Sequence, residues 1–409
     1  MRRITLIIIF TLSAYFSFGQ NNTNSPYSVF GIGELETSDG TRNFGMGGSG
    51  SALRSDIFIN LANPASLTAL PPQSMATDAG INFRYTTLKN DLNSVKVLNG
   101  NLSWAAIAFP INRKIGISFA LNPKSNVGYT IYSTKSLDGT IMSYPVKYSG
   151  NGGLTEASFS IGAAAAKNLS IGLRSSVVWG SMIETNVDLP PMGSTITRVD
   201  NVNYIGATLK PGFQFHTKLS EKTYFTLGGT AELSSYLNGS SNLSVTAGTT
   251  LVLSEVNKHS QLELPFKGAL GMALEFNRKY IFAADYSRSD YRKSSVNMDV
   301  RGLALNETYH VGVELAPKYD VQRLGQVKRY RMGALYQTGY LVISGVQINS
   351  YAATVGVSLP IRRDRNSLNV SMEIGKQGSL QSHLILENYC KLNLGFCLWE
   401  RWFIPRKYD

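Results

Sequence analysis

The stretch that decides the fold is Tyr351–Gly375, which reads YAATVGVSLPIRRDRNSLNVSMEIG. Apolar side chains occupy every second position from Tyr351 to Leu359, and they do so again from Leu368 to Ile374. An alternation with a period of two over about ten residues is typical of a β-strand whose two faces meet different surroundings. The short polar link between the two runs makes them antiparallel neighbours. Because the other faces carry glycine, serine and Glu373, the pattern favours a transmembrane β-barrel with an apolar outside and a wet inside.

The same unit recurs along most of the chain. About 14 stretches alternate in this way: 79–85, 102–108, 115–121, 157–163, 169–173, 205–213, 223–236, 270–276, 280–286, 309–315, 330–336, 351–359, 368–374 and 392–398. We predict an all-β fold, a transmembrane antiparallel β-barrel of about 14 strands, because an even number closes such a barrel and satisfies its backbone in lipid. A soluble β-sandwich has a similar pattern, but Tyr and Trp near strand ends and polar residues facing a shared interior disfavour it.

Long polar segments separate several of the alternating stretches. We expect them to be loops outside the cell: Asn122–Leu154, Met182–Asn201, Gly239–Gln261 and Ser287–Glu307. Short links such as Asn112-Arg113-Lys114 belong on the periplasmic side.

The first 19 residues form a separate unit. Arg2 and Arg3 precede an apolar run, and Ser17 and Gly19 supply small residues for cleavage, so the segment is typical of a secretory signal peptide. The alternative, a membrane helix, needs about 20 apolar residues. We therefore predict three parts: a signal peptide at 1–19, an N-terminal plug or hatch at 20–72 and a transmembrane barrel at 73–409. The predicted location is the outer membrane of a Gram-negative cell.

The charge balance bears on the partners. The chain has 39 Lys and Arg against 27 Asp and Glu, a net charge of +12. A basic excess can indicate nucleic acid, but export argues against it, so we expect no nucleic-acid partner and assign the charge to anionic lipid head groups and lipopolysaccharide. Cys390 and Cys397 lie on one predicted strand, on opposite faces and over about 20 Å apart, so they do not form a disulfide with each other.

The segment 20–72 is rich in glycine and lacks sustained alternation. Gly45-x-Gly47-x-x-Gly50 matches a phosphate-binding loop in spacing, but no strand precedes it in a βαβ context. Asn63-Pro64-Ala65 predicts a turn that opens a short helix. A compact insert ahead of a barrel fits inside the lumen as a plug.

These residues carry a resemblance to a known family. Gly45, Gly47 and Gly48, followed by Asn63-Pro64-Ala65, resemble the N-terminal region of FadL-type outer-membrane proteins. Motifs near the far end, such as Glu373-Ile374-Gly375 and Glu400-Arg401-Trp402-Phe403, resemble a branch of that family from Bacteroidota envelopes. The resemblance implies a 14-stranded barrel with an N-terminal hatch, and many members of the family import hydrophobic compounds.

Two function classes follow. One is passive transport of hydrophobic, fatty-acid-like small molecules past the plug, for which the candidate ligand-binding residues are Phe44, Met46, Ile57, Phe58 and Leu61. Each of these could equally form the plug's own core. The other is a barrel that does not transport but serves as a subunit or scaffold of a larger secretion or assembly complex, with other envelope proteins as partners. A continuous apolar tunnel favours transport, whereas a charged and fully packed lumen favours the scaffold.

Ionisable residues cluster on the predicted inner face. His310, Glu314, Arg331 and Glu373 could form a polar binding site in the lumen, or simply hydrogen-bond across the barrel interior. Spacing nominates no Ser–His–carboxylate set among the four histidines. We therefore expect no enzyme activity, no cofactor and no metal site.

Overall fold

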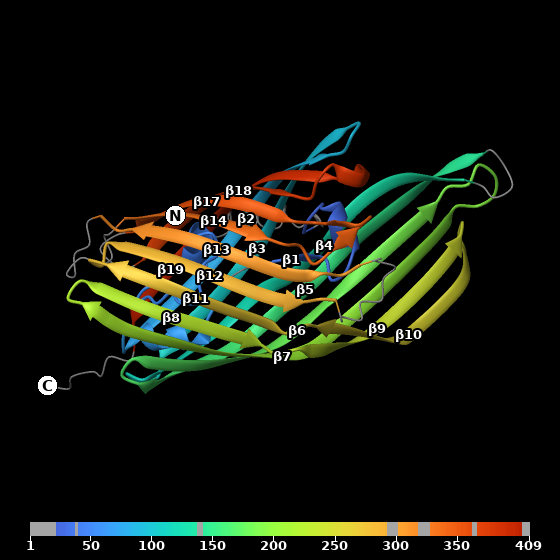
Figure 1. Cartoon of the computed structure of the whole chain (residues 1–409). Coiled ribbons are helices and arrows are strands. Elements are labelled where there is room, and N and C mark those ends of the chain that lie inside the picture. The colour runs from blue at the N-terminus through green and yellow to red at the C-terminus, as the bar shows by residue number, and fades with distance from the viewer. Residues whose placement is uncertain are drawn as a thin grey trace, which may run out of the picture.

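A closed barrel forms the body of the molecule (Figure 1). The computed structural model describes residues 22–36, 40–136, 142–292, 302–317, 328–361 and 366–402, and within them fourteen antiparallel strands pair in a ring that β19 closes against β2. The strands are β2 (Ser74–Lys89), β3 (Ser94–Pro110), β4 (Ile115–Ser136), β5 (Ser143–Ala166), β6 (Leu169–Asp188), β7 (Ile196–Ser220), β8 (Thr223–Glu232), β11 (Lys267–Phe276), β12 (Tyr280–Asp290), β13 (Leu305–Leu315), β14 (Arg329–Gln337), β17 (Ser350–Pro360), β18 (Ser367–Gln377) and β19 (Leu386–Arg401). The predicted fold class and strand number are confirmed.

The two faces of the wall are inverted relative to a soluble protein. Large apolar side chains such as Phe119, Phe282 and Met332 are exposed on the outside, whereas polar ones such as Ser358 and Asn369 are buried inside. This is the arrangement of a barrel with lipid around it and polar groups in its lumen. The alternation in the sequence therefore predicted both faces correctly.

The long polar segments were wrongly predicted as loops. Asn122–Ser136 and Ser143–Leu154 continue β4 and β5, and Met182–Asp188 continues β6. Residues 239–261 belong to a hairpin of β9 (Ser235–Ala247) and β10 (Thr250–Leu264), which pairs with the upper part of β7. Part of Ser287–Glu307 lies outside the described residues. Above the bilayer both faces of a strand are wet, so polar residues continue the sheet without the apolar alternation that marks a membrane strand.

The segment 22–73 lies inside this ring, where Figure 1 draws it in blue. Its elements are η1 (Pro26–Val29), β1 (Glu34–Leu35), α2 (Thr41–Gly45) and η2 (Pro64–Ala69). Because β2 begins at Ser74, we keep the division into an N-terminal segment 20–72 and a barrel 73–409 as a proposal. The predicted signal peptide, residues 1–19, lies outside the described residues. In the part of the chain that the structure describes, none of the helices is long and apolar enough to span a membrane.

A row of glycines seats η2 against the inner wall. Gly116, Gly162, Gly172 and Gly212 are register partners across β4, β5, β6 and β7. A Cβ atom at any of them would come within 2.6 Å of Asn63, Pro64, Ala65 or Leu67. The missing side chains therefore let the helix lie directly on the sheet, and they determine where the N-terminal segment is held.

Candidate functional site

A buried ion network joins the N-terminal segment to the wall. Arg42 of α2 donates from Nε and Nη2 to Glu314 on β13, at 3.0 and 3.1 Å. Arg331 on β14 donates to the same carboxylate at 2.7 Å, and the guanidinium of Arg329 lies 4.0 Å from it. Arg331 also donates to Asn369 Oδ1 at 3.4 Å. These charged groups are almost fully buried, so each depends on the others for the solvation that water would supply.

Two further networks lie closer to the outer side. Glu34 and Glu36 of the N-terminal segment pair with Arg84 on β2 and Lys391 on β19, the second pair at 2.9 Å. Arg84 also lies 3.5 Å from Glu387 on β19. The wall residue Lys124 pairs with Glu156 at 3.5 Å and with Glu232. The lumen is thus filled by paired charges at several heights.

The structure brings together only part of the predicted lumen cluster. Glu314 and Arg331 form one network, whereas His310 meets the carbonyl of Gly47 at 2.6 Å through Nδ1. Glu373 instead accepts from the hydroxyl of Tyr389 at 2.9 Å. Sequence reasoning missed Arg42, Glu34 and Glu36; their only signal is that they are charged residues in a segment rich in glycine and asparagine.

The five candidate ligand-binding residues of the plug are distributed over separate contacts. Met46 packs with Leu53 and two wall alanines, Ile57 and Phe58 pack near Cys397, and Leu61 joins the cluster around Trp104. Phe44 is partly exposed towards a small cavity, with Lys391 Nζ 5.7 Å from its ring centre. Four of the five are at most 3% exposed. The structure does not place them around one pocket, and their role in ligand binding stays a prediction.

The predicted plug motif contacts the wall through its backbone. Gly47 and Gly48 adopt positive φ angles of 66° and 85°, and the amide of Gly47 donates to Thr354 Oγ1 at 2.9 Å. Thr354 in turn donates to the carbonyl of Gly45 at 3.2 Å. Asn63 caps η2 by accepting from the amide of Ala65 at 3.1 Å, and Pro64 occupies the first turn.

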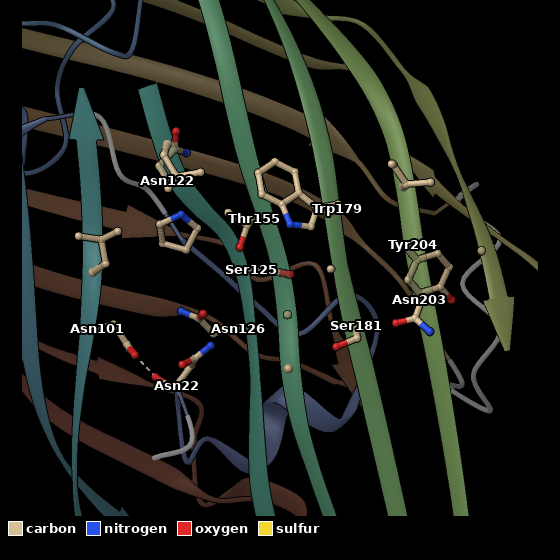
Figure 2. A pocket seen from close by; sticks show the side chains of 18 of the residues that line it. Asn22, Asn101, Asn122, Ser125, Asn126, Thr155, Trp179, Ser181, Asn203 and Tyr204 are labelled. Atoms are coloured by element: carbon tan, nitrogen blue, oxygen red, sulfur yellow. Dashed lines mark hydrogen bonds between the residues drawn. The ribbon is translucent and has the colours of Figure 1, made fainter. Parts of the chain in front are cut away.

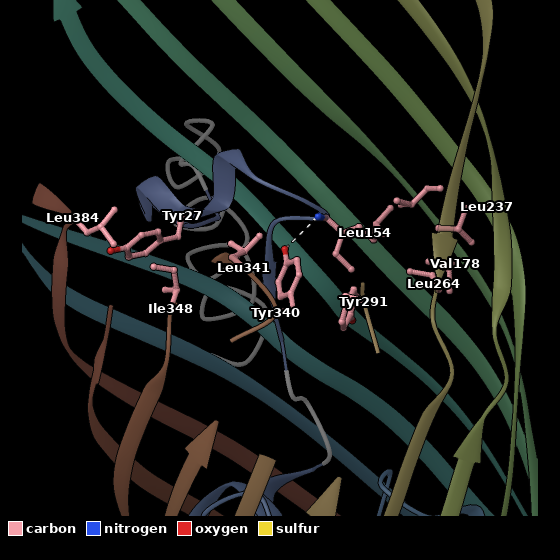
Figure 3. Packing of buried hydrophobic residues seen from close by; sticks show 12 residues of the cluster. Tyr27, Leu154, Val178, Leu237, Leu264, Tyr291, Tyr340, Leu341, Ile348 and Leu384 are labelled. Carbon is pink, nitrogen blue, oxygen red and sulfur yellow. Dashed lines mark hydrogen bonds between the residues drawn. The ribbon is translucent and has the colours of Figure 1, made fainter. Parts of the chain in front are cut away.

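An apolar cluster covers the segment on its outer side (Figure 3). The loop between β14 and β17, which carries β15 (Val342–Ile343) and β16 (Val346–Gln347), contributes to it. The hydroxyl of Tyr340 accepts from the amide of Ile32 at 3.3 Å and donates to the carbonyl of Gly33 at 2.6 Å. Its buried members are Tyr27, Ile32, Leu154, Val178, Leu237, Leu262, Leu264, Tyr291, Tyr340, Leu341, Ile348 and Leu384. The lumen is therefore closed twice, by charges below and by this outer cluster above.

The wall has an open seam between β3 and β4. These strands pair with each other only from Ala105–Pro110 to Gly116–Leu121, and among the described residues the edges Ser94–Trp104 and Asn122–Ser136 do not pair. The N-terminal segment satisfies part of the β4 edge instead. β1 pairs with Ser125 and Asn126, the amide of Glu36 donates to the carbonyl of Lys124 at 3.1 Å, and Ser28 Oγ contacts both backbone groups of Gly128 at 3.0 Å.

Comparison with known proteins identifies the family. A family model described as BamG matches residues 1–409, the whole chain. The chain belongs to the BamG family. No protein of curated function matches the sequence. The resemblance to FadL-type outer-membrane barrels is confirmed at the level of structure, and this BamG-family chain is accordingly an outer-membrane β-barrel.

Solved structures resemble this BamG-family barrel over nearly their whole length. The toluene transporter TbuX of Ralstonia pickettii aligns with a TM-score of 0.60 and 13% identity, over 89% of this chain and 98% of that one. A FadL homologue of Pseudomonas aeruginosa aligns at 0.60 and 12%, over 90% and 100%. The toluene transporter TodX of Pseudomonas putida aligns at 0.61 and 15%, over 90% and 99%. At these identities the likeness shows a shared fold.

Proposed function

We propose that this barrel is a non-transporting subunit of a larger outer-membrane assembly, the second of the two function classes that the sequence left open. The observation that carries the proposal is the closed lumen, in which charged side chains from the N-terminal segment and from the wall neutralise one another. A hydrophobic compound moving along this path would have to pass buried ion pairs such as Arg42–Glu314. Separating them would leave desolvated charges, which costs several kcal/mol per ion.

The size and lining of the inner cavities support the same proposal. The two that border the N-terminal segment near Glu34 and near Lys124 hold about 110 and 120 Å³. Pockets for small organic ligands usually hold about 300–1,000 Å³ and are mostly apolar. Charged groups line both cavities, including Arg84 and Lys391 in the first and Glu156 and Glu232 in the second. Such spaces suit a few water molecules better than a hydrocarbon.

The family offers independent support. The prefix of the description BamG is the one used for components of the β-barrel assembly machinery. A barrel in such a complex needs a stable wall and exposed surfaces for partners, and it needs no conduit. The extended outer ends of β4 to β7 and the β9–β10 hairpin supply a surface of this kind above the membrane (Figure 1).

Transport of hydrophobic small molecules is the second candidate. The open seam between β3 and β4 favours it, because a gap in the wall offers a sideways route between the lumen and the bilayer. The solved channels for toluene share the fold, which adds weight to this candidate. In that case the N-terminal segment along the β4 edge would have to move for a compound to pass.

Mass spectrometry of what accompanies the protein distinguishes the two. The protein is purified gently from its native membrane, and both co-purifying proteins and small molecules are identified. Envelope proteins present in stoichiometric amounts, with no apolar compound bound, are the expected result. Bound fatty acids or other apolar compounds without a stoichiometric partner would overturn the proposal in favour of transport.

Uptake into liposomes provides the second measurement. Liposomes containing the purified barrel are expected to take up radiolabelled toluene or oleate no faster than liposomes without protein. Deleting the loop 338–349, which closes the outer cluster, is the matched variant, since it opens the mouth but leaves the charged lumen in place. Rapid uptake by the unmodified protein would contradict the assembly proposal.

A further inference from the structure

A large recess lies in the wall at the open seam (Figure 2). It measures about 960 Å³ and is formed by β3, β4, β5, β6, β7 and β9 together with Asn22 of the N-terminal segment. Leu102, Leu121, Trp179 and Ile205, which line it, are 37–60% exposed on the outside of the barrel. The recess therefore opens towards the membrane and its outer interface, and it is separate from the small charged cavities of the lumen.

The lining is polar but carries no charge. None of the residues that line the recess is Asp, Glu, Lys, Arg or His. Six of them are asparagines: Asn22, Asn101, Asn122, Asn126, Asn203 and Asn238. Amides and hydroxyls without cations hydrogen-bond to uncharged groups, whereas phosphate recognition in proteins relies on arginine and lysine. The chemistry of the recess thus excludes a head group held through its phosphate.

Two buried polar atoms at the recess have no hydrogen-bond partner among the described residues. They are Asn122 Oδ1 and Ser125 Oγ, on adjacent turns of the β4 bulge, and their residues are only 9% and 1% exposed. Leaving such groups unpaired costs free energy, so they indicate a missing partner. A ligand hydroxyl can donate to the amide oxygen and also satisfy the serine, which a hydrocarbon cannot do.

Aromatic rings border the same space. Trp179 on β6 and Tyr204 on β7 line the recess at the upper limit of the exposed apolar band of the wall. Tryptophan and tyrosine gather at the level of the lipid head groups, where one side of the ring is apolar and the other is wet. Their faces suit the apolar face of a sugar ring.

An apolar groove continues from the recess down the outer wall. It measures about 670 Å³ and shares Leu121 with the recess. The small side chains of Ala79, Ala105 and Ala157 hollow it out, and Phe119 and Phe159 flank it. A groove of this composition at membrane depth accommodates an acyl chain.

We propose that the recess and groove together bind one glycolipid of the outer leaflet, with its uncharged sugar in the recess and its acyl chain along the groove. Asn122 and Ser125 hydrogen-bond to sugar hydroxyls, and Trp179 packs against the sugar ring. This proposal does not depend on whether the barrel is an assembly subunit or a channel. A glycolipid bound here also covers the open seam, because it lies over the gap that β3 and β4 leave.

Native mass spectrometry of the full-length detergent-solubilised protein tests the proposal with three lipids that have identical oleoyl chains. They are a monoglucosyl diacylglycerol, a phosphatidylglycerol and the plain diacylglycerol. We expect the glucosyl lipid to be retained about tenfold more than either of the others, as two or three added contacts imply. Equal retention of all three would overturn the proposal, because it would show ordinary lipid around a barrel.

Variants assign the binding to the recess. Asn122→Ala combined with Ser125→Ala, and separately Trp179→Leu, are expected to reduce retention of the glucosyl lipid to that of phosphatidylglycerol. Trp179→Leu keeps an apolar residue on the exposed wall, so it tests the site even if the double variant folds poorly. Asn201→Ala is the matched control, since the amide oxygen of Asn201 also lacks a partner but lies outside the recess. Unchanged retention in both recess variants, or an equal loss in the control, would refute the assignment.

Discussion

Arg42 and Glu314, 272 positions apart in the chain, form a two-bonded ion pair of 3.0 and 3.1 Å inside the barrel. This pair connects the N-terminal segment to β13, and it also neutralises one of the two charges that the wall residues Arg329 and Arg331 contribute. The carboxylate of Glu314 is therefore the centre of a cluster of three guanidinium groups.

Replacing this carboxylate should destabilise the fold strongly. Glu314→Gln leaves three buried guanidinium groups without their shared anion, and we expect a loss of about 3–5 kcal/mol. Urea unfolding in liposomes, followed by the heat-modified shift on gels, measures it. Glu255→Gln removes an exposed carboxylate 3.6 Å from Lys258 and should change stability by less than about 1 kcal/mol. A similar small effect at Glu314 would show that the network does not hold the segment.

Adding one methyl group to the glycine row should displace η2. In Gly172→Ala the new Cβ would come 2.5 Å from the backbone of Pro64 and Ala65, which cannot move without the helix. We expect a loss of about 1–3 kcal/mol from overpacking, measured by the same unfolding assay. Gly268→Ala is the control, because its Cβ would meet nothing closer than 3.4 Å. Equal stability of the two variants would mean that η2 is not seated on the row.

The seam predicts a change in accessibility. In Gly128→Ala the Cβ would lie 2.0 Å from the carbonyl of Thr23, so the beginning of the N-terminal segment must leave the β4 edge. With Thr23→Cys as a reporter, we expect this variant to react with a membrane-impermeant maleimide at least about tenfold faster than the reporter alone, because Thr23 is otherwise 5% exposed. The reporter with Gly268→Ala should react at the slow rate. Slow reaction in both would place the segment's anchor elsewhere.

The outer cluster should be sensitive to alkali. Burial raises the pKa of Tyr27 and of Tyr291 to about 12, and it raises the pKa of Tyr340 still further above its usual range. In the unfolded chain these phenols ionise near pH 10, so the folded state binds more protons above that pH and its stability falls as pH rises from about 10 to about 12. Absorbance at 295 nm follows ionisation, and Tyr340→Phe should titrate with one late phenol fewer. Ionisation of every tyrosine near pH 10 without loss of structure would contradict this.

Removing the inner part of the N-terminal segment tests whether it is a plug. Deletion of Phe44–Ser66 takes out η2's first turn and the contacts of Gly47 but leaves every barrel strand. We expect a folded, heat-modifiable barrel that conducts ions in planar bilayers, whereas the intact protein does not. A failure to fold would refute a removable plug and make the segment part of the barrel's core.

Most of the barrel could be predicted from the sequence. Alternation with a period of two located all fourteen wall strands, including Tyr330–Tyr336 and Leu368–Ile374, because the face of a strand residue depends only on its parity. The same rule failed above the membrane, where β4, β5 and β6 continue with polar residues on both faces. The lumen cluster was half right for a related reason: parity places His310 and Glu373 inside but does not say which inner residue each one meets.

The sequence by itself thus determined the closed β-barrel, its inverted faces and its membrane location, since these follow from local alternation and from the need to satisfy every backbone group in lipid. Only the tertiary structure decided that Arg42 meets Glu314, that four glycines from β4 to β7 align under η2, and that Asn122 and Ser125 face an uncharged recess at the seam. These relationships depend on the register between strands and on the path of the N-terminal segment through the lumen. Both are set by packing between residues far apart in the chain, which no local pattern records.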